Sequence, residues 1–297
     1  MDRIIVGFDG SETSHTALAW AVAEARLHHA TLAVWTILDD QAGHLTDRPS
    51  TPTPTLHGTK LAVDKRIGGF PAEHRIGQGQ PAAELVRACT AADLLVVGSR
   101  GHNPLANLLL GSVSRACLHA APCPVVVVHA QPPAGHRRII VGIDASPAAR
   151  QALVVAAEEA RLRRAALHAI HAVHWDHLGT ELITPSTRQL VALGNHLLDR
   201  ELAQTNVAAR PVIIPGHAPE VLVRHSTHAD LLVLGSRGHN PLTNLLLGST
   251  SDHCVRHAHC PVMIVPPPDA HTHTLKARER DQTERQPHET RRSSASS

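Results

Sequence analysis

The stretch Leu94-Leu95-Val96-Val97-Gly98-Ser99-Arg100-Gly101, followed after nine residues by Gly111-Ser112, occurs twice in this chain. The second copy runs from Leu231 to Gly238 and resumes at Gly248-Ser249. Over 92–112 and 229–249 the copies differ only where Val97 becomes Leu234 and Ala106 becomes Thr243. A glycine-rich turn between a buried strand and a helix is where α/β proteins bind phosphate groups. The stretch therefore predicts a tandem repeat and a nucleotide ligand.

The repeat extends well beyond this stretch. The segment Arg3–Asp9 is mirrored by Arg138–Asp144, and Cys123-Pro124-Val125 by Cys260-Pro261-Val262. Each repeat has about 130 residues, the size of a normal domain and too long a period for a solenoid. We expect a first half at residues 1–130 and a second half at 137–266, joined by a short Pro/Gly linker. The polar tail, 267–297, is predicted to be disordered.

Composition narrows the classes of function. With two Phe, three Trp and no Tyr, the chain has too few rings to bind nucleic acid mainly by base stacking. A net charge of +2 without a long basic run in either half argues against electrostatic DNA binding. The sequence contains no apolar stretch of about 18 residues, so no membrane span is predicted. Because Met1 lies so close to the first predicted strand, no signal peptide is expected. Five Cys without a disulfide framework fit the reducing cytoplasm.

In each half, continuous apolar runs alternate with segments in which apolar residues recur at helical spacing. A stripe of Leu18, Ala21, Val22 and Ala25 predicts the first helix. The other elements predicted in the first half are strands at 4–8, 31–38, 73–76, 94–97 and 125–128 and helices at 81–90 and 112–119. This alternation predicts an α/β fold of two tandem doubly wound domains. Each would be a five-stranded parallel sheet of order 3-2-1-4-5 with helices on both faces, and ligands would bind at the carboxyl ends of its strands.

The halves differ between their second and third strands. The second half has an amphipathic pattern over Ser186–Gln204 that predicts a helix. The first half has the Pro-rich segment 48–54, which cannot be helical, and a short helix is expected only near Leu61–Arg66. The apolar last strands, Val125–Val128 and Val262–Val265, are edges that seek a partner. We expect them to pair within the chain, giving a pseudo-twofold monomer that dimerises further.

The glycine pattern, the Asp after the first strand, the Ser two residues later and Cys-Pro-Val before the last strand together resemble the ATP-binding signature of the universal stress protein family. The resemblance covers about 2–130 and 137–266. The chain is therefore similar to the tandem-domain members that are common in actinobacteria. It implies a five-stranded parallel sheet, ATP binding, dimer contacts through the last strand and a regulatory role in stress. It also implies that the chain is a binding protein with weak or absent ATP hydrolysis.

Physical chemistry suggests a role for each matched residue. Gly98 and Gly101 lack a Cβ, so backbone can approach ribose and phosphate closely. The helix start at Gly111-Ser112 offers free amides to phosphates, and Asp9 could bind a ribose hydroxyl or hold Mg²⁺ through water. The resemblance aligns Ile37 and Ala172 with an adenine-contacting Val. The predicted nucleotide contacts are Asp9, Ile37, Gly98, Arg100, Gly101, Gly111, Ser112 and Val113, and in the second half Asp144, Ala172, Gly235, Arg237, Gly238, Gly248, Ser249 and Thr250.

Each of these residues also has a simpler interpretation. The glycines could serve only a tight turn, Asp9 could be a helix N-cap, and Arg100 and Arg237 could face solvent. Ser11 and Ser146 are better interpreted as helix caps than as ligands. The His253–Cys260 segment suggests zinc, but its Cys254 and Cys260 match Cys117 and Cys123, so buried structural cysteines are favoured and no metal site is predicted.

Two classes of function follow. The first is a nucleotide-binding regulator that holds ATP in each half and is read by its partners. The second is an ATPase or phosphotransferase, for which Arg100, His102 and Asn103, with their copies Arg237, His239 and Asn240, are the candidates. Turnover usually needs a Lys or Arg clamp on the γ-phosphate, and no Lys stands in either glycine loop. The binding protein is therefore favoured, with no catalytic residues assigned. A nucleotide-free interaction scaffold, in which the glycine loops are only structural, is the remaining alternative.

Overall fold

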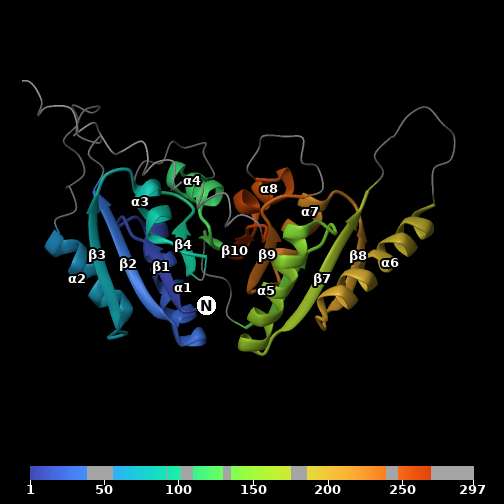
Figure 1. The fold of residues 1–297 in the computed structure, drawn as a ribbon, viewed down its shortest axis with the longest axis horizontal. Coiled ribbons are helices and arrows are strands. Elements are labelled where there is room, and N and C mark those ends of the chain that lie inside the picture. The colour runs from blue at the N-terminus through green and yellow to red at the C-terminus, as the bar shows by residue number, and fades with distance from the viewer. Residues whose placement is uncertain are drawn as a thin grey trace, which may run out of the picture.

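The computed structural model in Figure 1 describes residues 1–38, 56–91, 93–101, 110–129, 135–174, 186–238 and 247–268. In the first half the elements are β1 (Arg3–Gly7), α1 (Glu12–His28), β2 (Thr31–Leu38), α2 (Leu56–Ile67), β3 (Ala72–Gln78), α3 (Pro81–Ala88), β4 (Asp93–Gly98), α4 (Ser112–Ala120) and β5 (Val125–Val128). In the second half they are β6 (Arg138–Gly142), α5 (Pro147–Arg163), β7 (Ala166–Val173), α6 (Thr187–Thr205), β8 (Arg210–Pro215), α7 (Ala218–Ser226), β9 (Leu231–Gly235), α8 (Ser249–His257) and β10 (Val262–Val265).

All described strands belong to one sheet, of order β3-β2-β1-β4-β5-β10-β9-β6-β7-β8. The predicted α/β class and the order 3-2-1-4-5 within each half are confirmed. The two predicted sheets are not separate, because the halves join through their last strands in the middle of the molecule (Figure 1). There β5 and β10 pair antiparallel, with Val126 opposite Met263. Both residues are fully buried. Pairing within the chain, as expected, removes two apolar edges from solvent.

Helices cover both faces of this sheet, and each face has a core that runs across both halves. One core contains buried residues of α1, α2, α5 and α6, and the other contains residues of α3, α4, α7 and α8. The central strands are buried on both faces, which explains why they read as continuous apolar runs. The carboxyl ends of β1 and β4, and likewise of β6 and β9, therefore lie next to each other.

Local capping sets the helix limits. Ser11 and Ser146 accept hydrogen bonds from the amides of Ser14 and Ala149, at 3.3 and 3.2 Å, so the cap interpretation is confirmed. The expected 186–204 helix is α6, which Ser186 caps from just outside. The helix expected near 61–66 is longer, because α2 starts at Leu56. The Pro-rich segment 48–54, most of the linker and the tail from 269 onward lie outside the described residues.

The cysteines of both halves are buried and none forms a disulfide. Burial raises the pKa of Cys117, Cys254 and Cys260 to about 12, so these thiols stay protonated at neutral pH. Cys254 lies on the buried face of α8, in the apolar core. These cysteines therefore pack as small apolar residues, as the duplicated sequence predicts. No helix in the described part of the chain is long and apolar enough to cross a membrane.

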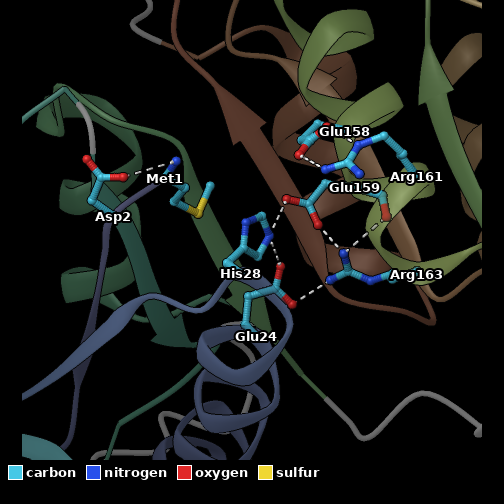
Figure 2. A network of polar contacts seen from close by, with 8 residues as sticks. All are labelled: Met1, Asp2, Glu24, His28, Glu158, Glu159, Arg161 and Arg163. Atoms are coloured by element: carbon cyan, nitrogen blue, oxygen red, sulfur yellow. Dashed lines mark hydrogen bonds and ion pairs between the residues drawn. The ribbon is translucent and has the colours of Figure 1, made fainter.

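A polar cluster joins the two halves where α1 and α5 meet, and Figure 2 shows it at close range. The Nε2 atom of His28 lies 3.1 Å from a carboxylate oxygen of both Glu24 and Glu159. Arg163 donates to Glu24 at 2.5 Å and also to Glu159. Both carboxylates are almost fully buried. Positions 24 and 28 correspond to 159 and 163 in the repeat, so the cluster has the pseudo-twofold symmetry of the chain.

This cluster is balanced in charge. Burial of the imidazole opposes its protonation, but the hydrogen bonds to Glu159 and Glu24 outweigh it and raise the pKa of His28 to about 9. Burial raises the pKa of Glu159, whereas at Glu24 burial is outweighed by the contacts with His28 and Arg163, which lower the pKa. When both are ionised, the two carboxylates face two cations. In the described structure, the donor atoms of Glu24, His28 and Glu159 lie within 4.8 Å of one another, a spacing suited to a metal. Because Arg163 and the protonated His28 together neutralise both carboxylates, the cluster is better explained as an ion-pair network.

Candidate functional site

The glycine that ends β4 packs directly against the first turn of α1. A Cβ on Gly98 would lie 2.7 Å from the Thr13 hydroxyl and 2.8 Å from its backbone carbon. At the end of β9, a Cβ on Gly235 would lie 2.7 Å from the backbone carbon of Ala148. Real Cβ atoms do not come this close to backbone. These two glycines, predicted as ligand contacts, therefore have a packing role that brings the loop against the helix start.

The second glycine of each loop lies under an aspartate. A Cβ on Gly101 would be 2.9 Å from Oδ2 of Asp9, and one on Gly238 would be 2.6 Å from Oδ2 of Asp144. The other carboxylate oxygen of each Asp accepts from the amide two residues later, at 2.9 Å. Asp9 therefore supports the turn before α1, while Ser11 is the N-cap of that helix. The carboxylates are held over the loop by the backbone.

The amide of Gly111 closes the first loop by donating to the Ser99 carbonyl at 2.7 Å, and Gly248 donates to Ser236 at 2.8 Å. Gly111 and Gly248 occupy the N-cap positions of α4 and α8, where no side chain caps the helix. The first amides of these helices, at Ser112-Val113 and Ser249-Thr250, thus start beside the loop without a side-chain acceptor. A helix start with free amides suits an anion.

Two serines that the sequence analysis passed over tie the helices to the strands. Ser114 donates to the Gly98 carbonyl at 2.6 Å, and Ser251 donates to the Gly235 carbonyl at 2.7 Å. Both serines are buried. Their identical place in the two copies, two residues after Ser112 and Ser249, was the available signal.

In the second half the predicted residues meet around one cavity of about 430 Å³. All eight predicted contacts line it: Asp144, Ala172, Gly235, Arg237, Gly238, Gly248, Ser249 and Thr250. Apolar side chains of Ile143, Ile170, Leu222, Leu234 and Leu247 also line it. The size and the combination of an apolar lining with a few polar groups are typical of a small-molecule site. His171 lines the cavity as well, and its Nδ1 lies 2.7 Å from the Ile143 carbonyl.

In the first half the predicted residues are less clearly gathered. Asp9 and Gly101 are adjacent, and the amide of Gly111 donates to the Ser99 carbonyl. Ile37 of β2 and Val113 of α4 are half-buried and pack against the core on that face. Arg100 instead lines an open cleft of about 1060 Å³ beside α1 and α2, together with Lys65, Arg66 and His129.

The arginines of both loops are exposed, as the simpler interpretation expects. Their backbone carbonyls accept hydrogen bonds, that of Arg100 from Thr13 and that of Arg237 from Ser146. The candidates for catalysis at 102, 103, 239 and 240 lie outside the described residues.

Comparison with known proteins identifies the family. The model of the universal stress protein family matches residues 1–129 and again 135–266. A universal stress protein of Mycolicibacterium smegmatis is 32% identical over 286 residues, covering 89% of this chain and 97% of that protein. A universal stress protein of Mycobacterium tuberculosis is 29% identical over 290 residues, covering 88% and 96%.

A solved structure shows the same fold. The crystal structure of a universal stress protein from Archaeoglobus fulgidus matches with a TM-score of 0.61 at 22% identity, covering 90% of this chain and 96% of that one. The duplicated glycine signature, the paired five-strand halves and the match over both halves lead to one conclusion: this chain belongs to the universal stress protein family.

Proposed function

We propose that this chain is a stress-response regulator that binds an adenine nucleotide, ATP being the expected ligand, and does not turn it over at an appreciable rate. The observation that carries the proposal is the cavity of the second half, where all eight residues predicted from the sequence meet. The resemblance proposed these residues from a spacing along the chain, whereas the cavity depends on their positions in space.

The residues present fit the parts of such a ligand. The uncapped start of α8 at Ser249-Thr250 and the bare backbone of Gly238 suit the phosphates. Asp144, held by the Ser146 amide, suits a ribose hydroxyl or a hydrated Mg²⁺ ion. The apolar side chains around Ile170 suit the base. Each helix start contributes only about 0.3–1 kcal/mol toward an anion, so the phosphates need all of these groups together.

Binding without turnover agrees with the groups that line the cavity. A phosphoryl-transfer site needs a cation on the γ-phosphate and also a residue that orients the attacking water. Arg237 lines the cavity as a possible cation, but neither glycine loop contains the Lys that would favour transfer. We also propose that the protein acts in the cytoplasm, where its buried thiols would stay reduced.

The proposal is tested by calorimetric titration of the purified chain with Mg-ATP, with Asp144→Asn as the site variant. Losing one charged hydrogen-bond partner is expected to weaken binding by about tenfold or more. Asp252→Asn is the matched control, because Asp252 pairs with Arg256 on α8 and does not line the cavity. The control should bind within about twofold of the parent chain. No heat of binding in the parent chain, or an equal loss in both variants, would contradict the proposal, and steady phosphate release would contradict the absence of turnover.

A further inference from the structure

The two halves differ at the strand that lines the cavity. In the second half, Ile170 and Ala172 of β7 line the cavity beside Leu222 and Leu234. The repeat places Trp35 and Ile37 of β2 at these two positions. The sheet registers agree with this, because Trp35 lies opposite Gly7 in β1 just as Ile170 lies opposite Gly142 in β6. Both exchanges put a larger side chain in the first half.

These larger side chains lie on the cavity side of the sheet. Trp35 and Ile37 pack against the core that contains Leu85 and Val97. Those residues are the repeat counterparts of Leu222 and Leu234, which line the second-half cavity. The indole Nε1 of Trp35 is buried and has no hydrogen-bond partner in the described structure. This edge of the ring therefore lies inside the protein, while the guanidinium carbon of Arg75 in β3 lies 5.7 Å from the ring centroid.

The outer strand β3 makes room for only part of the extra volume of these larger side chains. Gly77 of β3 lies opposite Ile37, whereas its counterpart in the second half is Ile214, opposite Ala172. A Cβ on Gly77 would be 3.8 Å from Ile37, so room exists beside that side chain. This room is at the outer edge of the sheet. The glycine loop follows β4, on the other side of β1 from β2 and β3. In the first half the space beside the loop is the open cleft at Arg100, which neither Trp35 nor Ile37 lines. In the second half Ile170 and Ala172 line the cavity together with the loop.

We infer that the halves are unequal nucleotide sites: the second half takes the base into its cavity, and Trp35 with Ile37 excludes the base from the first half. The chain then binds one nucleotide rather than two. This inference rests on the proposed function, and it adds which half binds and which residues decide it. The first half keeps the sheet and the loop geometry, and contributes β5 to the shared sheet.

The test is a reciprocal exchange read out as binding stoichiometry with Mg-ATP. The parent chain is expected to bind one ATP per chain. The variant Trp35→Ile/Ile37→Ala copies the second half and should raise the stoichiometry to two. The variant Ile170→Trp should lower binding in the second half by at least tenfold. Circular dichroism establishes that each variant is folded, and Ile170→Phe replaces Ile170→Trp if the larger ring prevents folding.

The outcomes separate this inference from the proposed function. Two ATP per parent chain with similar affinities would overturn the inference and leave nucleotide binding standing. Unchanged stoichiometry in the Trp35→Ile/Ile37→Ala variant, with full binding in the Ile170 variants, would also overturn it. No binding to the parent chain would instead remove the proposed function.

Discussion

At the scale of single residues, the structure separates two roles that the glycine pattern combines. Gly98 and Gly235 approach the backbone of a helix start, whereas Gly101 and Gly238 lie under an aspartate carboxylate. A spacing pattern cannot distinguish these roles, because both need a residue without a Cβ. The repeat of the whole pattern made the site recognisable, but the neighbour of each glycine is known only from the fold.

Replacement of Gly98 by Ala should therefore destabilise the protein even without nucleotide. The added Cβ meets the backbone of Thr13 and Ser14, which cannot move without shifting α1. We expect the free energy of unfolding in urea to fall by about 1–3 kcal/mol. The control is Gly77→Ala, at a strand position where a Cβ makes only ordinary contact with Ile37. Equal stability of the two variants would show that α1 is not held against the loop in this way.

At the scale of elements, α1 and α5 meet through the cluster of Glu24, His28, Glu159 and Arg163 (Figure 2). The hydrogen bonds from His28 to Glu159 and from Arg163 to Glu24 join residues that are 131 and 139 positions apart. The sequence analysis did not single out these four residues. A charged residue on a helix normally faces solvent, so its burial depends on how the two helices pack.

Removal of Glu159 should leave the two buried cations of this cluster sharing one carboxylate, Glu24. We expect Glu159→Ala to lower the free energy of unfolding by about 3–5 kcal/mol, since breaking a buried pair exposes its full desolvation cost. The neighbouring Glu158→Ala is the control, because that carboxylate is half exposed and pairs with the exposed Arg161. Its effect should stay below about 1 kcal/mol. If urea unfolding showed a similar loss of unfolding free energy in both variants, the cluster would not be buried in solution.

The cluster also predicts how stability depends on pH. The pKa of His28 rises from 6.5 to about 9 on folding, so the folded state holds this proton more tightly than the unfolded state. The resulting stabilisation, up to about 3 kcal/mol, is complete below pH 6.5 and is lost as the pH rises to about 9.

Thermal unfolding from pH 6 to 10 checks this, with His28→Gln as the comparison. The variant lacks the titrating group and should lose the part of the decline that lies between 6.5 and 9. If the unfolding temperatures of the two proteins fell in parallel with pH, His28 would be ruled out as the source of the decline.

At the scale of the whole molecule, ten strands form one sheet because each half ends in a short, fully apolar strand. Such a strand left at an edge would expose unpaired backbone groups and apolar side chains. Antiparallel pairing of β5 with β10 satisfies these backbone groups and buries these side chains. It also makes the halves a single body with a core on each face of the sheet. The same pairing places α1 beside α5, which forms the charged cluster.

A charge placed in this central pairing should therefore disrupt the whole chain. Val126 lies opposite Met263 and is fully buried, so Val126→Lys is expected to lower the free energy of unfolding by more than about 3 kcal/mol. It should also increase the radius of gyration in solution scattering, as the halves separate. Val154→Lys, on an exposed side chain of α5, is the tolerated control. Unchanged scattering together with unchanged stability in Val126→Lys would contradict the continuous sheet.

Much of the fold and of the site follows from local signals. Strands Thr31–Leu38, Val125–Val128 and Val262–Val265 have the limits that their apolar runs predict. The eight contacts proposed for the second half share one cavity, because the ends of adjacent parallel strands necessarily meet. The length of α2 was underestimated, because prolines just before Leu56 mask its start.

By itself, the sequence determined the family and the duplicated α/β order, and it predicted the residues that line the second-half cavity. These depend on periodicity and on turn residues, which act over a few positions along the chain. Only the tertiary structure decided that the two sheets are one, that Glu24 and Glu159 are buried with their cations, and that Trp35 stands where Ile170 opens a cavity. These features depend on which faces meet across more than a hundred residues, and packing in three dimensions, rather than any local preference, sets that.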